Sequence, residues 1–471
     1  MIAPSPQHAA RVRFIGAVPA SLVTSESSQD RSDVLRIVTF YMGLALVFVK
    51  FGMLHEIQTH VMGFKAYLLY IFGIPAGMGV LAAGGLRRTL TGRPAYYWIA
   101  FGVWMLICVP FSFWRGSSFG LVRMFFRDDL LILFVIGGLV VSWRECRHLM
   151  KVLAVAALVN VLASRIFSTA VSGGRLTLEF GNVANANDFA AHLLLTLPFL
   201  LLLAANSKSI LLRAAVLLPV GYGIVVIFKT ASRGALLALI VGTLFVLFRG
   251  NYRQRIAVAC LVPITIVAIL AFVPAGLLQR IRSFSAAEQN VSSEAMQSSD
   301  ARHYLLMKAI HYAIEFPIFG VGPGQFANYE GSHNRVLGKH GLYHAVHNTY
   351  VEAFTETGVV GGVLLLSAYI SSFLMLNRIY REARRRTDCQ DIQNTAFYIM
   401  LGMVGFCAAI MFLNFMICFY GPALAGLAIS VSRAAKYEFA HRQPAAGPGL
   451  GMMPVRQTLP SPRYLARTAS A

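Results

Sequence analysis

Two histidines and two glutamates lie close together in the segment HAVHNTYVEAFTETGVVGGVLLL (344–366), where the chain becomes strongly apolar. They are His344, His347, Glu352 and Glu356. Ionisable side chains at the edge of an apolar membrane helix are costly, and by default they mark a functional site. Because histidine exchanges a proton near neutral pH, His347 is a candidate general base. The alternative is a histidine whose polar tip only sits at an interface.

The same two histidines are also spaced like a metal-binding pair, three residues apart. No third ligand shares the face of His344 and His347 at helical spacing, so the sequence predicts no metal site. Glu352 and Glu356 are four residues apart and therefore share a face of a helix. Their carboxylates can orient a donor sugar, or they can simply form a solvated acidic face.

Three glycines follow the acidic residues at the spacing i, i+3 and i+4, namely Gly358, Gly361 and Gly362. A stripe of small residues lets a neighbouring helix approach closely. We therefore predict a packing role for these glycines. They would orient the helix that carries His347 without taking part in chemistry.

Two arginines stand beside predicted helix starts. Arg233 follows Thr230 and Ser232, either of which can cap an apolar helix over 233–248, and Arg302 follows the candidate cap Asp300. A cation at a helix N-terminus opposes the helix dipole, which favours an anionic partner for each arginine. Two such guanidinium groups close together at the outer edge of the membrane would form a diphosphate site, since guanidinium groups bind phosphate oxygens bidentately. The alternatives are a snorkelling Arg233 and a solvated Arg302.

A further polar cluster lies in GNVANANDFAAHL (181–193), just before another apolar stretch. Asn187 and Asp188 supply donors and acceptors suited to sugar hydroxyl groups. Capping of the following helix by either residue is the alternative interpretation.

Composition places all these residues in a membrane protein. The chain has 471 residues, of which 57% are hydrophobic and 13% charged. Apolar runs long enough to cross a bilayer, about 20 residues each, recur along it. The sequence predicts an all-α polytopic protein with about twelve transmembrane helices, and ten or eleven remain possible. The expected spans lie near 36–53, 66–84, 95–113, 128–142, 149–168, 188–204, 210–228, 233–248, 256–275, 352–376, 394–412 and 414–431.

The distribution of charge predicts the orientation. With the N-terminus placed in the cytoplasm, 26 of the 41 Lys and Arg residues fall on inner segments. This asymmetry follows the positive-inside rule and places both termini in the cytoplasm. The net charge of +21 is therefore a topology signal, and contact with anionic membrane lipids explains it better than nucleic-acid binding.

One long loop interrupts the series of spans. We expect a cytoplasmic extension at 1–35, nine spans within 36–275, a large outer loop at 276–351, three spans within 352–431 and a cytoplasmic tail at 432–471. Loops of such length are commonly functional or disordered. An amphipathic helix is predicted over 300–316, and the glycines of PIFGVGPGQF (317–326) are predicted to form turns.

Several of these motifs together resemble the O-antigen ligase and O-antigen polymerase superfamily. The sequence HN, followed by nine residues and GxxGG, resembles the hallmark of that family and contains His347, Gly358, Gly361 and Gly362. Three other stretches resemble its recurring segments in the same order, over roughly residues 95 to 430. These stretches are GN…NANDFA (181–190), SRGALLAL (232–239) and R…PIFGVGPGQF (302–326).

The resemblance implies a bacterial inner-membrane glycosyltransferase that acts without a metal or a cofactor. Such an enzyme transfers a glycan from undecaprenyl diphosphate to an acceptor hydroxyl at the periplasmic face. Residue by residue, His347 matches the family's essential histidine and Arg233 its first essential arginine. Arg302 best matches the second essential arginine, with Arg280 and Arg282 as rivals in the same loop. Inversion at the anomeric carbon is expected from a direct displacement.

Two alternatives remain open. A ligase in lipopolysaccharide or exopolysaccharide assembly would use lipid A–core or another terminal acceptor, whereas a polymerase would use a lipid-linked glycan. A transporter of the same lipids would also need many spans. Transport ranks lower, because the ionisable residues gather at one face and leave the centres of most spans apolar.

Overall fold

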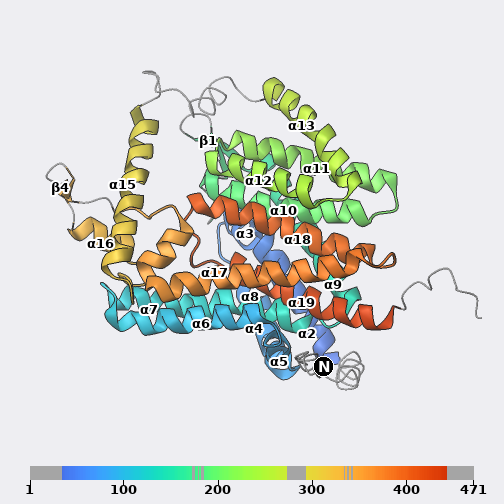
Figure 1. The fold of residues 1–471 in the computed structure, drawn as a ribbon, viewed down its shortest axis with the longest axis horizontal. Helices are drawn as coiled ribbons and strands as arrows, with labels where there is room; N and C mark the ends of the chain where they lie inside the picture. The colour runs from blue at the N-terminus through green and yellow to red at the C-terminus, as the bar shows by residue number, and fades with distance from the viewer. Residues whose placement is uncertain are drawn as a thin grey trace, which may run out of the picture.

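The computed structural model describes residues 34–171, 175–178, 180–181, 185–272, 293–333, 335–336, 339–340 and 343–442. Over these residues the fold is all-helical, as predicted, with two short hairpins (Figure 1). The first helices are α2 (Val34–Phe51), α3 (Leu54–Met62), α4 (Leu68–Ala82), α5 (Gly85–Thr89), α6 (Arg93–Cys108), α7 (Arg115–Met124), α8 (Leu130–Leu139) and α9 (Trp143–Ile166). The later ones are α10 (Ala186–Asn206), α11 (Ile210–Lys229), α12 (Arg233–Arg249), α13 (Tyr252–Phe272), α15 (Ser293–Glu315), α16 (Phe326–His333), α17 (Thr349–Arg384), α18 (Gln390–Ala409) and α19 (Tyr420–His441).

Seven helices in the described part of the chain are long and apolar enough to cross a membrane. Each of the twelve expected stretches coincides with a helix, but some of these are short: α8 has ten residues and α12 has 17. A span needs about 20 residues unless its neighbours shield its ends. The count of twelve therefore stays a prediction, whereas the multi-pass character is confirmed. The seven helices are α2, α6 with its 3-10 extension, α9, α10, α11, α17 and α18 with its 3-10 extension.

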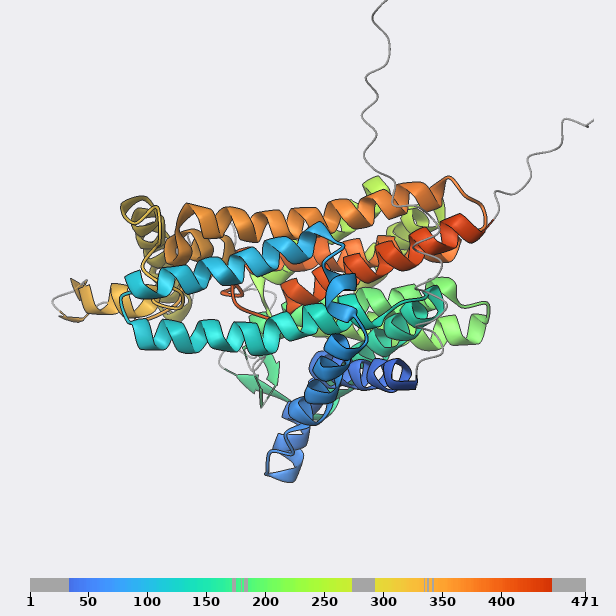
Figure 2. The ribbon, with the colours of Figure 1, turned by 90° about the horizontal axis from the view of Figure 1, so that it is seen from below.

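The bundle is built around α10. Its apolar window is 78% buried, against 28% for α11, so α10 is central and α11 peripheral. Leucine and alanine cover α10 on every side, which is the pattern of a helix surrounded by other helices. Helices α9, α11 and α18 pack against it. In Figure 2, α3 and α4 extend from the side of this bundle.

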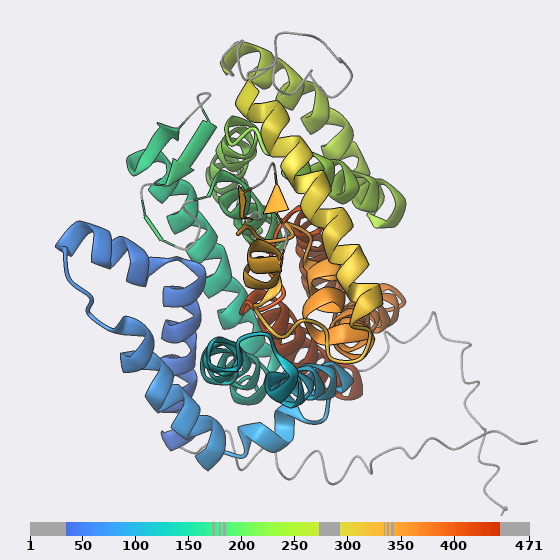
Figure 3. The same cartoon turned by 90° about the vertical axis from the view of Figure 1, so that its left-hand side faces the viewer.

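One end of the bundle carries the remaining elements, with α15 running across it (Figure 3). The antiparallel hairpins β1 (Ser168–Val171) with β2 (Arg175–Leu178), and β3 (Arg335–Val336) with β4 (Lys339–His340), were not predicted. Their strands have two to four residues, too short for an alternating pattern to stand out. The expected loop at 276–351 thus contains ordered helices in its described part.

The boundary predicted for the helix near 300–316 was wrong at its start. Helix α15 already begins at Ser293, so Asp300 lies inside it and is not its cap. The polar residues before Asp300 hid this start, because they show no apolar periodicity. The glycine turns after α15 are confirmed: Gly320, Gly322 and Gly324 all have positive φ, at 67°, 105° and 71°.

Candidate functional site

His347 occupies an unusual backbone position at the entrance to α17. Its φ of 55° is left-handed, a conformation that residues other than glycine seldom adopt. Asn348 follows as the N-cap, and its side chain accepts hydrogen bonds from the amides of Tyr350 and Val351, both at 3.1 Å. Strained backbone of this kind persists only where its surroundings enforce it, and it concentrates at functional sites.

The surroundings of His347 favour a neutral imidazole. The ring is half-buried, and burial is the main cause that lowers its pKa, followed by the positive charge of Arg302 and by His344. A neutral ring keeps one nitrogen available to accept a proton. The geometry brings Arg302 and His344 to His347, although His344 itself is exposed.

Arg302 reaches this position because α15 is docked on α17. The hydroxyl of Thr355 in α17 donates to the carbonyl of Ala309 in α15 at 2.8 Å. Val346, next to His347, joins a small apolar cluster with Leu305 of α15. Arg302 is exposed and lies well inside α15, so its expected place in the first turn of a helix was wrong. The positive charge of Arg302 therefore lowers the pKa of His347 without a contribution from the dipole at the start of α15.

Arg233 is the first residue of α12, as its sequence predicts. Ser232 is the N-cap, and its side chain accepts from the amide of Ala235 at 3.3 Å. Ala231, which precedes the cap Ser232, has a φ of 48°. Helix α12 therefore also starts after a left-handed residue that is not glycine. Arg233 is half-buried. It is therefore held at a positive helix end, where an anion would be stabilised.

The segment after α18 connects the starts of α12 and α17. A Cβ on Gly234 would lie 2.7 Å from the ring of Phe412, so α12 begins directly against that side chain. The hydroxyl of Thr349 donates to the carbonyl of Leu413 and accepts from the amide of Phe415, both at 2.8 Å. Both helix starts thus contact residues 412–415, through Gly234 in α12 and Thr349 in α17.

Arg175 is a polar contributor that the sequence reasoning missed. From β2 it donates to the carbonyl of Thr230 at 2.9 Å and to Oδ1 of Asn187 at 2.8 Å. It therefore ties the turn before Arg233 to the start of α10. A basic residue on a segment expected to lie outside opposes the positive-inside rule, and that signal could have identified Arg175 as it did Arg233.

Asn187 and Asp188 lie in the first turn of α10, but neither caps it. The cap is Asn185, whose side chain accepts from the amide of Asn187 at 3.0 Å. Asn187 is instead the partner of Arg175, and Asp188 is half-buried. The capping alternative was wrong because the helix starts at Ala186, two residues earlier than a cap at Asn187 requires and three earlier than a cap at Asp188 requires.

The two glutamates of α17 differ in their surroundings. Glu356 is buried and accepts from the amides of Gly324 at 2.6 Å and Phe326 at 3.1 Å, so it clamps the glycine-rich turn onto α17. Glu352 is half-buried, and its Oε2 is enclosed without a hydrogen-bond partner among the described residues. The interpretation of this pair as a solvated acidic face was wrong, since both carboxylates face protein.

The glycine stripe packs, but Gly358 also has a backbone role. Its φ of 67° breaks the helical geometry inside α17, and a Cβ there would collide with the carbonyl of Ile318. The amide of Val359 donates to the carbonyl of Pro317 at 2.8 Å across this kink. Gly361 has Trp104 of α6 close by, as a packing stripe requires.

Two further arginines and the question of a metal ion remain to be considered. Arg280 and Arg282 lie outside the described residues. Within the described ranges, no group of three or more His, Cys, Asp or Glu side chains is placed to hold a metal ion.

Comparison with known families gives one match. The O-antigen ligase family model matches residues 215–366, a stretch that contains Arg233, Arg302 and His347. No curated protein matches the chain. The family implies a glycosyltransferase-like activity in general, acting on lipid-linked glycans in a membrane. Residues 215–366 therefore match the O-antigen ligase family, which supports the resemblance to the O-antigen ligase superfamily, and the chain is a multi-pass membrane protein.

Proposed function

We propose that this protein is an inverting glycosyltransferase that moves a glycan from undecaprenyl diphosphate to an acceptor hydroxyl. The reaction takes place at the periplasmic face of the inner membrane, in lipopolysaccharide or exopolysaccharide assembly. Both termini lie in the cytoplasm. The single observation that carries the proposal is the setting of His347, a half-buried imidazole in left-handed backbone beside Arg302.

The residues of the site suit a direct displacement. The acceptor oxygen attacks the anomeric carbon, and the bond from that carbon to the diphosphate oxygen breaks. His347 takes the proton of the attacking hydroxyl, a step that contributes about 10²–10⁴-fold in enzymes that use it. The electron pair leaves with undecaprenyl diphosphate. Arg233 and Arg302 stabilise the charge that develops on this leaving group.

Other polar groups have supporting roles in this proposal. Asn187 and Asp188 bind sugar hydroxyl groups, and His344 lines the approach to His347. Arg175 positions the turn before Arg233 through its bond to the carbonyl of Thr230. Arg280 and Arg282 remain alternatives to Arg302 as the second phosphate ligand. No step requires a metal ion, because the diphosphate is already an activated leaving group.

The acceptor separates two versions of the proposal. In a ligase, lipid A–core or another terminal molecule supplies the hydroxyl group. In a polymerase, a lipid-linked repeat unit supplies it. The family match supports both versions alike, so the acceptor that the protein uses separates them.

The test uses the full chain in nanodiscs with an undecaprenyl diphosphate-linked oligosaccharide as the donor. Release of undecaprenyl diphosphate and the mass of the glycan product are followed with each acceptor in turn. His347→Ala should abolish release. His311→Ala is the matched control, since it removes an exposed imidazole of α15 that has no role in the proposed site, and it should retain most activity.

Each outcome discriminates between the candidates. Product that needs a lipid A–core acceptor identifies a ligase, and longer lipid-linked glycan identifies a polymerase. A retained anomeric configuration would contradict direct displacement. Movement of the intact lipid across the bilayer, with no release for any acceptor, would replace the enzyme with a transporter.

A further inference from the structure

Helices α2 and α9 form a parallel pair at the side of the bundle. Arg36 near the start of α2 makes an ion pair with Glu145 near the start of α9, at 2.8 Å, and their side chains are 3% and 13% exposed. Glu145 also completes the capping box of α9 with Ser142. The two helices therefore begin at the same end of the bundle, and this contact fixes their spacing there.

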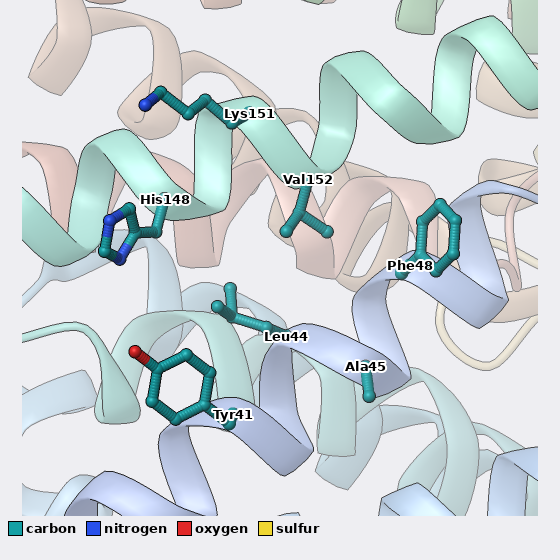
Figure 4. Close-up of a pocket in the computed structure, with 7 residues that line it drawn as sticks. All are labelled: Tyr41, Leu44, Ala45, Phe48, His148, Lys151 and Val152. Atoms are coloured by element: carbon teal, nitrogen blue, oxygen red, sulfur yellow. The ribbon is translucent and has the colours of Figure 1, made fainter.

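A groove of about 430 Å³ lies between these two helices, a size within the range of about 300–1,000 Å³ typical of small-molecule sites (Figure 4). Leu44, Ala45 and Phe48 of α2 face Val152 of α9 across it. Leu44 is buried. Because both helices are candidate membrane spans, a groove between them that reaches the surface opens toward lipid.

The mouth of the groove is polar and basic. It is lined by Tyr41, His148 and Lys151, of which Tyr41 and Lys151 are exposed. Arg144 and Arg147 are exposed as well, and with His148 and Lys151 they follow the spacing of one helix face. Nearby Glu145 is already paired with Arg36, so it does not neutralise this stripe.

We propose that the groove binds an anionic phospholipid of the surrounding bilayer. One acyl chain lies against Leu44, Ala45 and Phe48, and the phosphate lies beside Lys151 and His148. Basic pockets between transmembrane helices are known binding sites for anionic headgroups. The site is separate from Arg233 and His347 and does not depend on the proposed transfer reaction.

The position of Lys151 along its helix fits this occupant. It lies eight residues after Trp143, about 12 Å along the helix axis. Side chains in a helix tilt toward its N-terminus, and lysine buries its stem while its ammonium extends to the interface. The Lys151 ammonium is thus directed back toward the membrane surface at which α2 and α9 begin, where a lipid phosphate lies.

Native mass spectrometry of the full chain in detergent tests this assignment. Phosphatidylglycerol and phosphatidylcholine are supplied in equal amounts, and the retained lipids are counted. The wild-type protein should retain phosphatidylglycerol preferentially. Lys151→Gln should lower that retention about fivefold, the effect of one basic residue at a membrane surface. Lys208→Gln, which removes an exposed lysine in the loop before α11, should leave it unchanged.

A second variant tests the apolar part of the groove. Ala45→Phe fills the space between the helices and should lower retention of the anionic lipid while Lys151 stays in place. Thermal unfolding of each variant establishes that it is folded. Equal retention of the two lipids by the wild-type protein would overturn the proposal, and so would equal losses from Lys151→Gln and Lys208→Gln.

Discussion

Helices α12 and α17 start with the same backbone motif, but the candidate functional residue occupies a different position in each. Each has a left-handed residue other than glycine followed by an N-cap, Ala231 before Ser232 in one and His347 before Asn348 in the other. In α12 the strained residue is an inert alanine, and the candidate phosphate ligand is the first residue of the helix itself. In α17 the strained residue is the candidate base.

The difference indicates how each functional group is held. Arg233 takes its direction from α12, whose first turn is fixed by Phe412 and, through Thr230, by Arg175. His347 stands outside α17, so its ring depends on a backbone conformation enforced by the cap of Asn348 and by the docking of α15. The arginine is positioned by a regular element, and the histidine by local strain.

After the loss of the base itself, the largest effect is expected at the start of α12. Arg233→Lys keeps the charge but loses bidentate contact with phosphate. We expect a loss of about 100-fold in kcat, the scale of removing one donor that acts on a developing charge. Release of undecaprenyl diphosphate under saturating donor measures it. Arg249→Lys, at the other end of α12, is the control and should retain full activity.

The two caps should differ in their contribution to stability. The Asn348 side chain accepts two amide bonds, whereas that of Ser232 accepts one. Loss of a cap costs about 0.5–2 kcal/mol, so Asn348→Ala should fall near 2 and Ser232→Ala near 1. Thermal unfolding in one detergent compares them. Equal losses would mean that the second bond at Asn348 contributes nothing.

A third prediction concerns pH and His347. A general base acts in its neutral form, which is lost as the pH falls through the pKa of the ring. Arg302 helps to lower that pKa, so Arg302→Gln should raise it and move the acid limb of the rate profile to higher pH. The pH at the midpoint of the acid limb is compared separately from the maximal rate, because Arg302→Gln also removes a proposed phosphate ligand and lowers that rate. An unmoved limb would place the titrating group elsewhere.

Sequence reasoning recovered those parts of the molecule that depend on local pattern. Apolar runs located the helices, the Ser232 cap set the start of α12, and glycine content identified the turns after α15. These features are encoded within a few neighbouring residues, which is why one sequence is enough to find them.

Features that depend on contacts between distant segments could not be found this way. Arg175 binds Thr230 and Asn187 only because a short hairpin folds back over two helix starts. The clamp formed by Glu356 joins residues about thirty positions apart, and nothing near Glu356 distinguishes it from a solvated acid. The left-handed backbone of His347 likewise depends on the docking of α15 as well as on the neighbouring cap of Asn348.

The smallest expected effect is the change in stability when glycine replaces each left-handed residue, and it tests the comparison of the two helix starts most directly. A left-handed residue costs roughly 1–2 kcal/mol unless it is glycine, so Ala231→Gly and His347→Gly should each stabilise the protein by about 1 kcal/mol. Their activities should diverge, since only His347→Gly removes the proposed base. Thermal unfolding and donor turnover are measured on the same preparations. If Ala231→Gly also abolished turnover at unchanged or raised stability, the rigidity of the turn before Arg233 would itself be required, and the alanine would not be inert.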